Sequence, residues 1–214
     1  MRLRVLQVGR RAKTGDFAVL RCLGCFQADS GQVVLNGEEI TDLPMYLRAR
    51  SGISYLPQEP SVFRQLTSEE NLLAVLETLP LTPEQQRDRL EELLAQMGLE
   101  TVRQSKAYML SGGERRRLEI ARSLTLQPSF ILLDEPFSGI DPLTVRDLQE
   151  LIRELSRSGI GVLITDHNVR ETLSVTDRAY IVNRGRIMAK GTPRDLSDNP
   201  EVRRVYLGDT FRLN

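Results

Sequence analysis

Two short stretches of this 214-residue chain carry side chains that suit metal and phosphate chemistry. Asp134 and Glu135 follow the apolar run 130–133, a pattern typical of a buried strand. Open α/β sheets bind ligands at the carboxyl ends of such strands, where these carboxylates could serve a metal ion and a water. Upstream, Ser111–Gly113 opens a helix, and its uncovered backbone N–H groups and the helix dipole favour a phosphate. Together the two stretches indicate nucleotide chemistry.

Five motifs follow one another along the chain. They are YLPQE at 55–59, LSGGE at 110–114, FILLDEP at 130–136, SGID at 138–141 and ITDH at 164–167. In this order they resemble the Q-loop, signature, Walker B, D-loop and H-loop of ATPase subunits of ABC transporters. The resemblance covers about residues 27–214. Within the family, the runs RARSGISYLPQEPSVFRQLT, LITDHNVRETL, AYIVNRGRIMAKGTP and RVYLGDTFRLN are most similar to members that serve bacterial lipopolysaccharide export.

The resemblance implies that the chain binds ATP and Mg²⁺ and hydrolyses the ATP. Asp134 is then expected to hold Mg²⁺ through water, and Glu135 to orient and deprotonate the attacking water. Gln58 would reach both Mg²⁺ and that water. His167, the only histidine in the chain, would contact the γ-phosphate and Glu135. Without the resemblance, a strand-end carboxylate pair, a loop glutamine and a strand-end histidine would be read as ordinary structural residues.

The signature implies a partner subunit. In this family two ATPase subunits dimerise head to tail, so Ser111, Gly112 and Gly113 would face a nucleotide held by the second subunit, with Asp141 of the D-loop nearby. Asp141 also begins an amphipathic helix. Transmembrane transporter subunits complete the assembly, and the helical insert at about 60–108 matches the part of the family fold that faces them. Homodimer and heterodimer both stay open.

Residues 1–26 depart from the family pattern. A P-loop reads G-x-x-x-x-G-K-[ST], because its glycines let backbone N–H groups curl around phosphates. Lys13 and Thr14 supply the final pair, but Gln7 and Ala12 replace the glycines. The pair is therefore either a phosphate ligand set or a solvated lysine beside a threonine. A degenerate or truncated subunit that does not hydrolyse ATP is one alternative. Because the residues serving this chain's own site are kept, we expect a shifted reading frame or start upstream of about residue 27.

Strands alternating with capped helices predict an α/β sheet. We expect one ABC ATPase domain over residues 1–214. It would comprise a RecA-like core, a helical subdomain at about 60–108, and an N-terminal β part that is incomplete because residues 1–26 diverge.

Local signals place several elements. Thr67 and Thr82 each begin a capping box, and residues 90–97 have apolar side chains at helical spacing. Asn36-Gly37 predicts a hairpin. Asn168, with Glu171 three residues later, predicts a further capped helix.

Composition narrows the class of protein. Basic and acidic residues balance at 29 each, and the chain has no Trp, which argues against nucleic-acid binding. The apolar runs are too short to span a bilayer, and no secretory signal is visible. We therefore expect a cytoplasmic protein, peripheral on the inner membrane and reaching it only through partners. Cys22 and Cys25 are expected to be reduced and without a ligand. The ATPase of a branched-chain amino-acid importer stays an alternative. Identifying the membrane proteins that co-purify with the chain would decide between the two functions.

Overall fold

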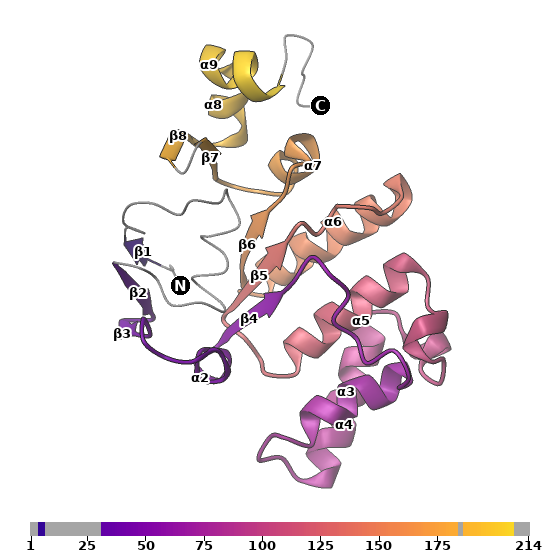
Figure 1. Cartoon of the computed structure of the whole chain (residues 1–214). Helices are drawn as coiled ribbons and strands as arrows, with labels where there is room; N and C mark the ends of the chain where they lie inside the picture. The colour runs from indigo at the N-terminus through magenta and orange to yellow at the C-terminus, as the bar shows by residue number, and fades with distance from the viewer. Residues whose placement is uncertain (1–3, 7–30, 184–185, 208–214) are drawn as a thin grey trace.

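Three parallel strands form the centre of the molecule (Figure 1). The computed structural model describes residues 4–6, 31–183 and 186–207. The central strands lie in the order β4 (Ile53–Leu56), β5 (Phe130–Asp134) and β6 (Gly161–Thr165). Both pairings are parallel, with Leu56 opposite Leu133 and Asp134 opposite Thr165. The carboxyl ends of all three strands therefore meet at one edge of the sheet.

Helices precede, connect and follow these strands, as the predicted alternation requires. They are α2 (Met45–Arg50), α3 (Ser68–Leu76), α4 (Pro83–Gln96), the 3₁₀ turns η1 (Glu100–Val102) and η2 (Ala107–Met109), α5 (Gly112–Leu124), α6 (Pro142–Arg157) and α7 (Val169–Leu173). The α/β prediction is confirmed.

Two smaller antiparallel sheets accompany the central one. The first contains β1 (Arg4–Leu6), β2 (Gln32–Leu35) and β3 (Glu38–Glu39). Asn36 and Gly37 turn between β2 and β3 with φ of 54° and 93°, which confirms the predicted hairpin. The second pairs β7 (Ala179–Asn183) with β8 (Arg186–Gly191). The chain continues through α8 (Pro193–Asp198), α9 (Pro200–Val202) and the π-helical turn η3 (Arg203–Leu207).

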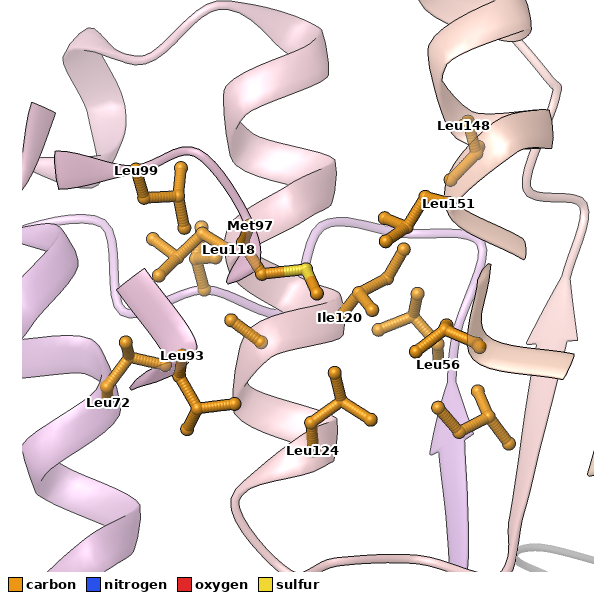
Figure 2. Close-up of a cluster of buried hydrophobic side chains, with 14 of the residues drawn as sticks. Leu56, Leu72, Leu93, Met97, Leu99, Leu118, Ile120, Leu124, Leu148 and Leu151 are labelled. Carbon is orange, nitrogen blue, oxygen red and sulfur yellow. The ribbon is translucent and has the colours of Figure 1, made fainter. Parts of the chain in front are cut away.

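A single large cluster of buried side chains connects the helical insert to the sheet (Figure 2). Helix α5 lies between the two, and its Leu118 and Ile120 are fully buried. Leu72 and Leu93 approach it from α3 and α4, while Leu56 comes from β4. Burying such side chains stabilises the fold by about 1.5–3 kcal/mol each. Any displacement of α5 would therefore disturb the insert and the sheet together.

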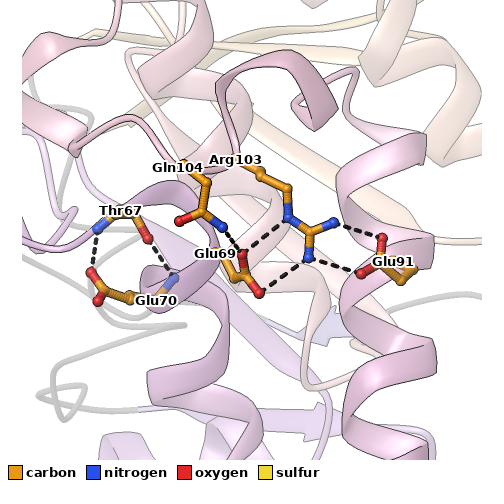
Figure 3. Close-up of polar contacts among 6 residues, drawn as sticks. All are labelled: Thr67, Glu69, Glu70, Glu91, Arg103 and Gln104. Carbon is orange, nitrogen blue, oxygen red and sulfur yellow. Dashed lines mark hydrogen bonds and ion pairs between the residues drawn. The ribbon is translucent and has the colours of Figure 1, made fainter.

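Polar contacts fix the insert further (Figure 3). The Thr67 hydroxyl accepts from the Glu70 amide at 3.1 Å, and the Glu70 carboxylate accepts from the Thr67 amide at 2.7 Å. The capping box predicted at Thr67 is confirmed, as is the one at Thr82. Arg103 donates to Glu69 of α3 and Glu91 of α4 and so joins the two helices. This hydrogen bond from Arg103 lowers the pKa of Glu69.

One predicted cap is wrong. Asn168 occupies the N-cap position of α7, but its side chain makes no capping hydrogen bond. The Glu171 carboxylate instead accepts from Gln149 Nε2 of α6 at 2.6 Å, and Asp166 Oδ1 accepts from the Asn168 amide at 2.8 Å. Contacts with another helix and with the preceding loop have replaced the local capping pattern.

Several predictions fall on residues that the structure does not describe. Outside the described residues lie Lys13 and Thr14, as well as the two residues that depart from the P-loop pattern, Gln7 and Ala12. Both cysteines also lie outside them. Among the helices of the described residues, none has the length and apolar character needed to cross a membrane.

Candidate functional site

The predicted catalytic and metal residues gather at the carboxyl edge of the central sheet. Asp134 ends β5, and Glu135 follows it directly. Gln58 lies two residues beyond the end of β4, and His167 two residues beyond the end of β6. The parallel pairing of the three strands brings these four residues together from three separate parts of the sequence.

Asp134 is almost completely buried, with 2% of its surface exposed. Its two carboxylate oxygens each accept one hydroxyl hydrogen bond. Thr165 Oγ1 donates to Oδ1 at 2.8 Å, and the Tyr55 hydroxyl donates to Oδ2 at 2.8 Å. The carboxylate is therefore held from both neighbouring strands by neutral donors.

Glu135 is held in a backbone conformation that non-glycine residues seldom adopt, with φ of 45°. Its amide donates to the Thr165 carbonyl at 2.7 Å, a contact that compensates for the strained backbone. The Glu135 carboxylate lies between two side chains. Gln58 Nε2 donates to Oε2 at 2.5 Å, and His167 Nε2 lies 2.8 Å from Oε1. His167 thus lies against Glu135, as expected, whereas the contact between Gln58 and Glu135 was not predicted from the sequence.

Asp166 stabilises the loops on either side of this cluster. Its Oδ2 accepts from the Phe137 amide at 2.9 Å, and its Oδ1 accepts from the Asn168 amide. Phe137 is itself buried in the main core. The sequence-based reasoning missed Asp166, and also Tyr55 and Thr165, although all three lie inside the quoted motifs.

The loop that carries Gln58 is attached to helix α5. Glu119 Oε1 accepts from the Ser61 amide at 2.8 Å, and Arg116 Nη1 donates to the Pro57 carbonyl at 3.2 Å. Arg116 and Glu119 also form an ion pair at 2.9 Å, with side chains only 10% and 4% exposed. Arg116, in the run of three arginines after the signature, is therefore paired within the chain.

The signature residues form the N-terminus of α5. The Ser111 hydroxyl accepts from the Glu114 amide and donates to the Glu114 carboxylate, which also accepts from the Ser111 amide. The hydroxyl and amide donors of Ser111 lower the pKa of Glu114. Gly112 is exposed, and a Cβ built there would meet nothing within 4 Å. A phosphate could approach the backbone N–H groups of this turn.

Asp141 caps helix α6 beside the signature. Its Oδ1 accepts from the amides of Leu143 and Thr144 at 3.0 Å, and the Thr144 hydroxyl donates to Oδ2. That hydroxyl contact is the main cause that lowers the pKa of Asp141. A Cβ built on Gly113 would lie 3.0 Å from Thr144 Cγ2, so a larger residue there would require Thr144 to move by a few tenths of an ångström. The predicted signature and D-loop residues are therefore neighbours.

The donor set fits Mg²⁺ and a nucleotide. Mg²⁺ prefers oxygen ligands, keeps several waters, and takes the remaining ligands from substrate phosphates rather than from a protein cage. The ordered Asp134 carboxylate supplies such an oxygen site. The described residues contain no group of three or more His, Cys, Asp or Glu that could hold a metal ion, so phosphate and water would have to complete its coordination.

Comparisons with known proteins agree with this geometry. A family model described as "ABC transporter" matches residues 19–138, and one described as "Branched-chain amino acid ATP-binding cassette transporter" matches residues 186–212. The chain is 54% identical over 201 residues to the "Lipopolysaccharide export system ATP-binding protein LptB" of Acidithiobacillus ferridurans, covering 94% of this chain and 83% of that protein. The Haemophilus influenzae protein of the same name is 53% identical, with the same shares covered.

Solved structures show the same fold. An ATP-binding cassette of an ABC transporter in its ADP conformation is 26% identical, with a TM-score of 0.79 over 91% of this chain and 84% of that one. A nucleotide-free ATP-binding cassette is 27% identical, with a TM-score of 0.77 over 90% of this chain and 83% of that one. The predicted ABC ATPase fold is confirmed. By sequence, fold and the arrangement of its motifs, this chain belongs to the ATP-binding subunits of ABC transporters, a family whose members bind and hydrolyse ATP.

Proposed function

We propose that this chain is the ATP-hydrolysing subunit of an ABC transporter that exports lipopolysaccharide from the inner membrane. The observation that carries the hydrolytic part is the contact of Glu135 with Gln58 and His167, directly beside the buried Asp134. The assignment of the transported substrate rests on relatives that are more than 50% identical in sequence to this chain and whose names state lipopolysaccharide export.

In this proposal each residue at the sheet edge has a separate task. A bound Mg²⁺ would supply charge stabilisation for phosphoryl transfer to water, and Asp134 would hold it through a water. Glu135 would orient the attacking water and accept its proton. Gln58 and His167 hold the Glu135 carboxylate from two sides, and they would place it relative to the nucleotide.

The remaining predicted residues would serve nucleotide binding. Ser111, Gly112 and Gly113, with Asp141 beside them, would face ATP held by a second ATPase subunit in a head-to-tail dimer. Lys13 and Thr14 would bind phosphate on this chain's own side. The domain would extend over the whole chain. Its helical insert at about 60–108 would face transmembrane subunits and so place the protein on the cytoplasmic face of the inner membrane.

Nucleotide binding and turnover test the hydrolytic part of the proposal. The full chain should bind a fluorescent ATP analogue in the presence of Mg²⁺ and release phosphate from ATP. Glu135→Gln should keep the binding and lose turnover by at least about 100-fold, the usual contribution of a general base. Glu150→Gln, on the exposed face of α6, is the matched control and should leave both unchanged. Absence of any Mg-ATP binding would favour the degenerate, non-hydrolysing alternative. Unchanged turnover in Glu135→Gln would remove Glu135 from its role.

A second candidate function has one specific observation in its favour. The family model matched by residues 186–212 is described as a branched-chain amino acid transporter. We favour lipopolysaccharide export because that match covers only the C-terminal part, whereas the lipopolysaccharide-export relatives are similar over most of the chain. Membrane proteins that co-purify with a tagged chain from its own cells would decide between the two. Partners that function in amino-acid uptake would overturn the export proposal.

A further inference from the structure

Tyr55 makes a polar contact that none of the assigned roles uses. Its hydroxyl donates to Asp134 Oδ2 at 2.8 Å across 79 residues of sequence. The opposite oxygen, Oδ1, receives the Thr165 hydroxyl. Because Asp134 is buried, these two hydrogen bonds are held in surroundings of low dielectric, where they orient the carboxylate strongly.

The strand register explains how Tyr55 reaches Asp134. Tyr55 of β4 pairs with Leu132 of β5, and residues two apart on one strand point to the same face. The Tyr55 side chain therefore shares a face with Leu132 and Asp134, and it extends along the strand toward the carboxylate. Its ring packs against the buried cluster that includes Leu132, Ile53 and Phe130. The packing of the ring therefore fixes the position of the hydroxyl beside Asp134.

This arrangement preorganises the Asp134 carboxylate. The terminal torsion of an Asp side chain is broad and roughly two-fold, so an unrestrained carboxylate has to be ordered when a metal binds. Two neutral donors fix its plane and occupy two of about four acceptor positions. Among the described residues no other hydrogen bond to this carboxylate is present, which leaves the remaining positions for metal-bound water. Both hydroxyl donors are neutral, so neither competes with the metal by charge.

We propose that Tyr55 is a positioning residue that orients Asp134 for Mg²⁺, an inference that rests on the proposed function. The hydroxyl, rather than the ring, carries the effect. Its removal should weaken the Mg²⁺-dependent part of nucleotide binding and leave the part that does not need metal unchanged.

The experiment compares Tyr55→Phe with the wild-type full chain. Phe keeps the ring and its packing but lacks the donor. Binding of a fluorescent ATP analogue is titrated with Mg²⁺ and repeated in EDTA, and urea unfolding is measured in parallel. We expect the Mg²⁺ concentration that gives half of the Mg²⁺-dependent increase in nucleotide binding to rise about tenfold. A hydrogen bond to a charged group contributes a free energy that corresponds to about a tenfold change in affinity or more. Affinity in EDTA should stay the same.

Two further variants sharpen the test. Thr165→Val removes the opposite donor and should shift the Mg²⁺ dependence in the same direction. Tyr46→Phe, on an exposed tyrosine of α2, is the control and should shift nothing. An unchanged or lower Mg²⁺ requirement in Tyr55→Phe would overturn the inference, since the hydroxyl would then be neutral or competing with the metal. Equal losses with Mg²⁺ and with EDTA would make Tyr55 merely structural and overturn it too. If the wild-type chain binds no nucleotide, the proposed function itself fails, and this inference fails with it.

Discussion

Glu119→Ala should be one of the most destabilising single substitutions in the chain, although Glu119 is a charged residue on a helix. Its carboxylate accepts from the Ser61 amide at 2.8 Å and from Arg116 at 2.9 Å. Both side chains of the ion pair are at least nine-tenths buried. Arg116 Nη2 already has no hydrogen-bond partner among the described residues. Truncating Glu119 would leave Arg116 as an uncompensated buried charge.

The expected magnitude follows from that burial. Removing one partner of a buried ion pair costs about 3–5 kcal/mol, and the orphaned Ser61 amide adds about 1 kcal/mol or more. We therefore expect a loss of about 4–6 kcal/mol in the free energy of unfolding. With an m value near 3 kcal/mol/M, roughly the upper end for urea, a loss of about 4 kcal/mol lowers the urea midpoint by about 1.3 M.

Urea unfolding, followed by circular dichroism, measures this shift against a matched control. Glu150 pairs with Arg153 and Arg157 on the exposed face of α6, so Glu150→Ala should cost less than about 1 kcal/mol. The double variant Arg116→Met with Glu119→Leu removes both charges and should be more stable than Glu119→Ala alone. If Glu119→Ala cost no more than Glu150→Ala, the argument from burial would be refuted.

Two further predictions concern packing and pH. A Cβ built on Gly161 would lie 2.1 Å from Cε1 of Phe130 in the adjacent strand, so Gly161→Ala should destabilise the fold by about 1–3 kcal/mol in urea unfolding. Gly112→Ala, with open space around it, should change stability by less than about 0.5 kcal/mol; equal effects would contradict the packing argument. Glu114 has its pKa lowered in the folded chain by the hydroxyl and amide donors of Ser111. Its ionised form therefore contributes stability above the ordinary pKa of 4.5, and this is lost as the pH falls through the lower folded value. Glu114→Gln should therefore be less stable than wild type at pH 7, and the difference should shrink below about pH 4.5; a constant difference across that range would count against the assigned cause.

The sequence by itself determined the family and the alternation of strands with capped helices, and through the family resemblance it named Asp134, Glu135, Gln58 and His167. Asp134 and Glu135 could be predicted because the apolar run before them and the residues after them form a local motif that resembles the Walker B motif of the family. The capping boxes at Thr67 and Thr82 could be predicted for the same reason, because in each box the threonine and its partner residue are three positions apart in the sequence. Patterns within about one helical turn constrain the backbone whatever the rest of the chain does.

Only the tertiary structure decided which side chains support those residues. Tyr55 reaches Asp134 across 79 residues, and Ser61 reaches Glu119 across 58, so both contacts depend on strand register and on where α5 packs. The failed cap at Asn168 has the same origin, because a contact between Glu171 and α6 took the place of the local one. The energy of a long-range hydrogen bond depends on burial and alignment, which neighbouring residues in the sequence do not record. The chemistry of the carboxylates could therefore be predicted from the sequence, whereas their orientation depends on the tertiary structure.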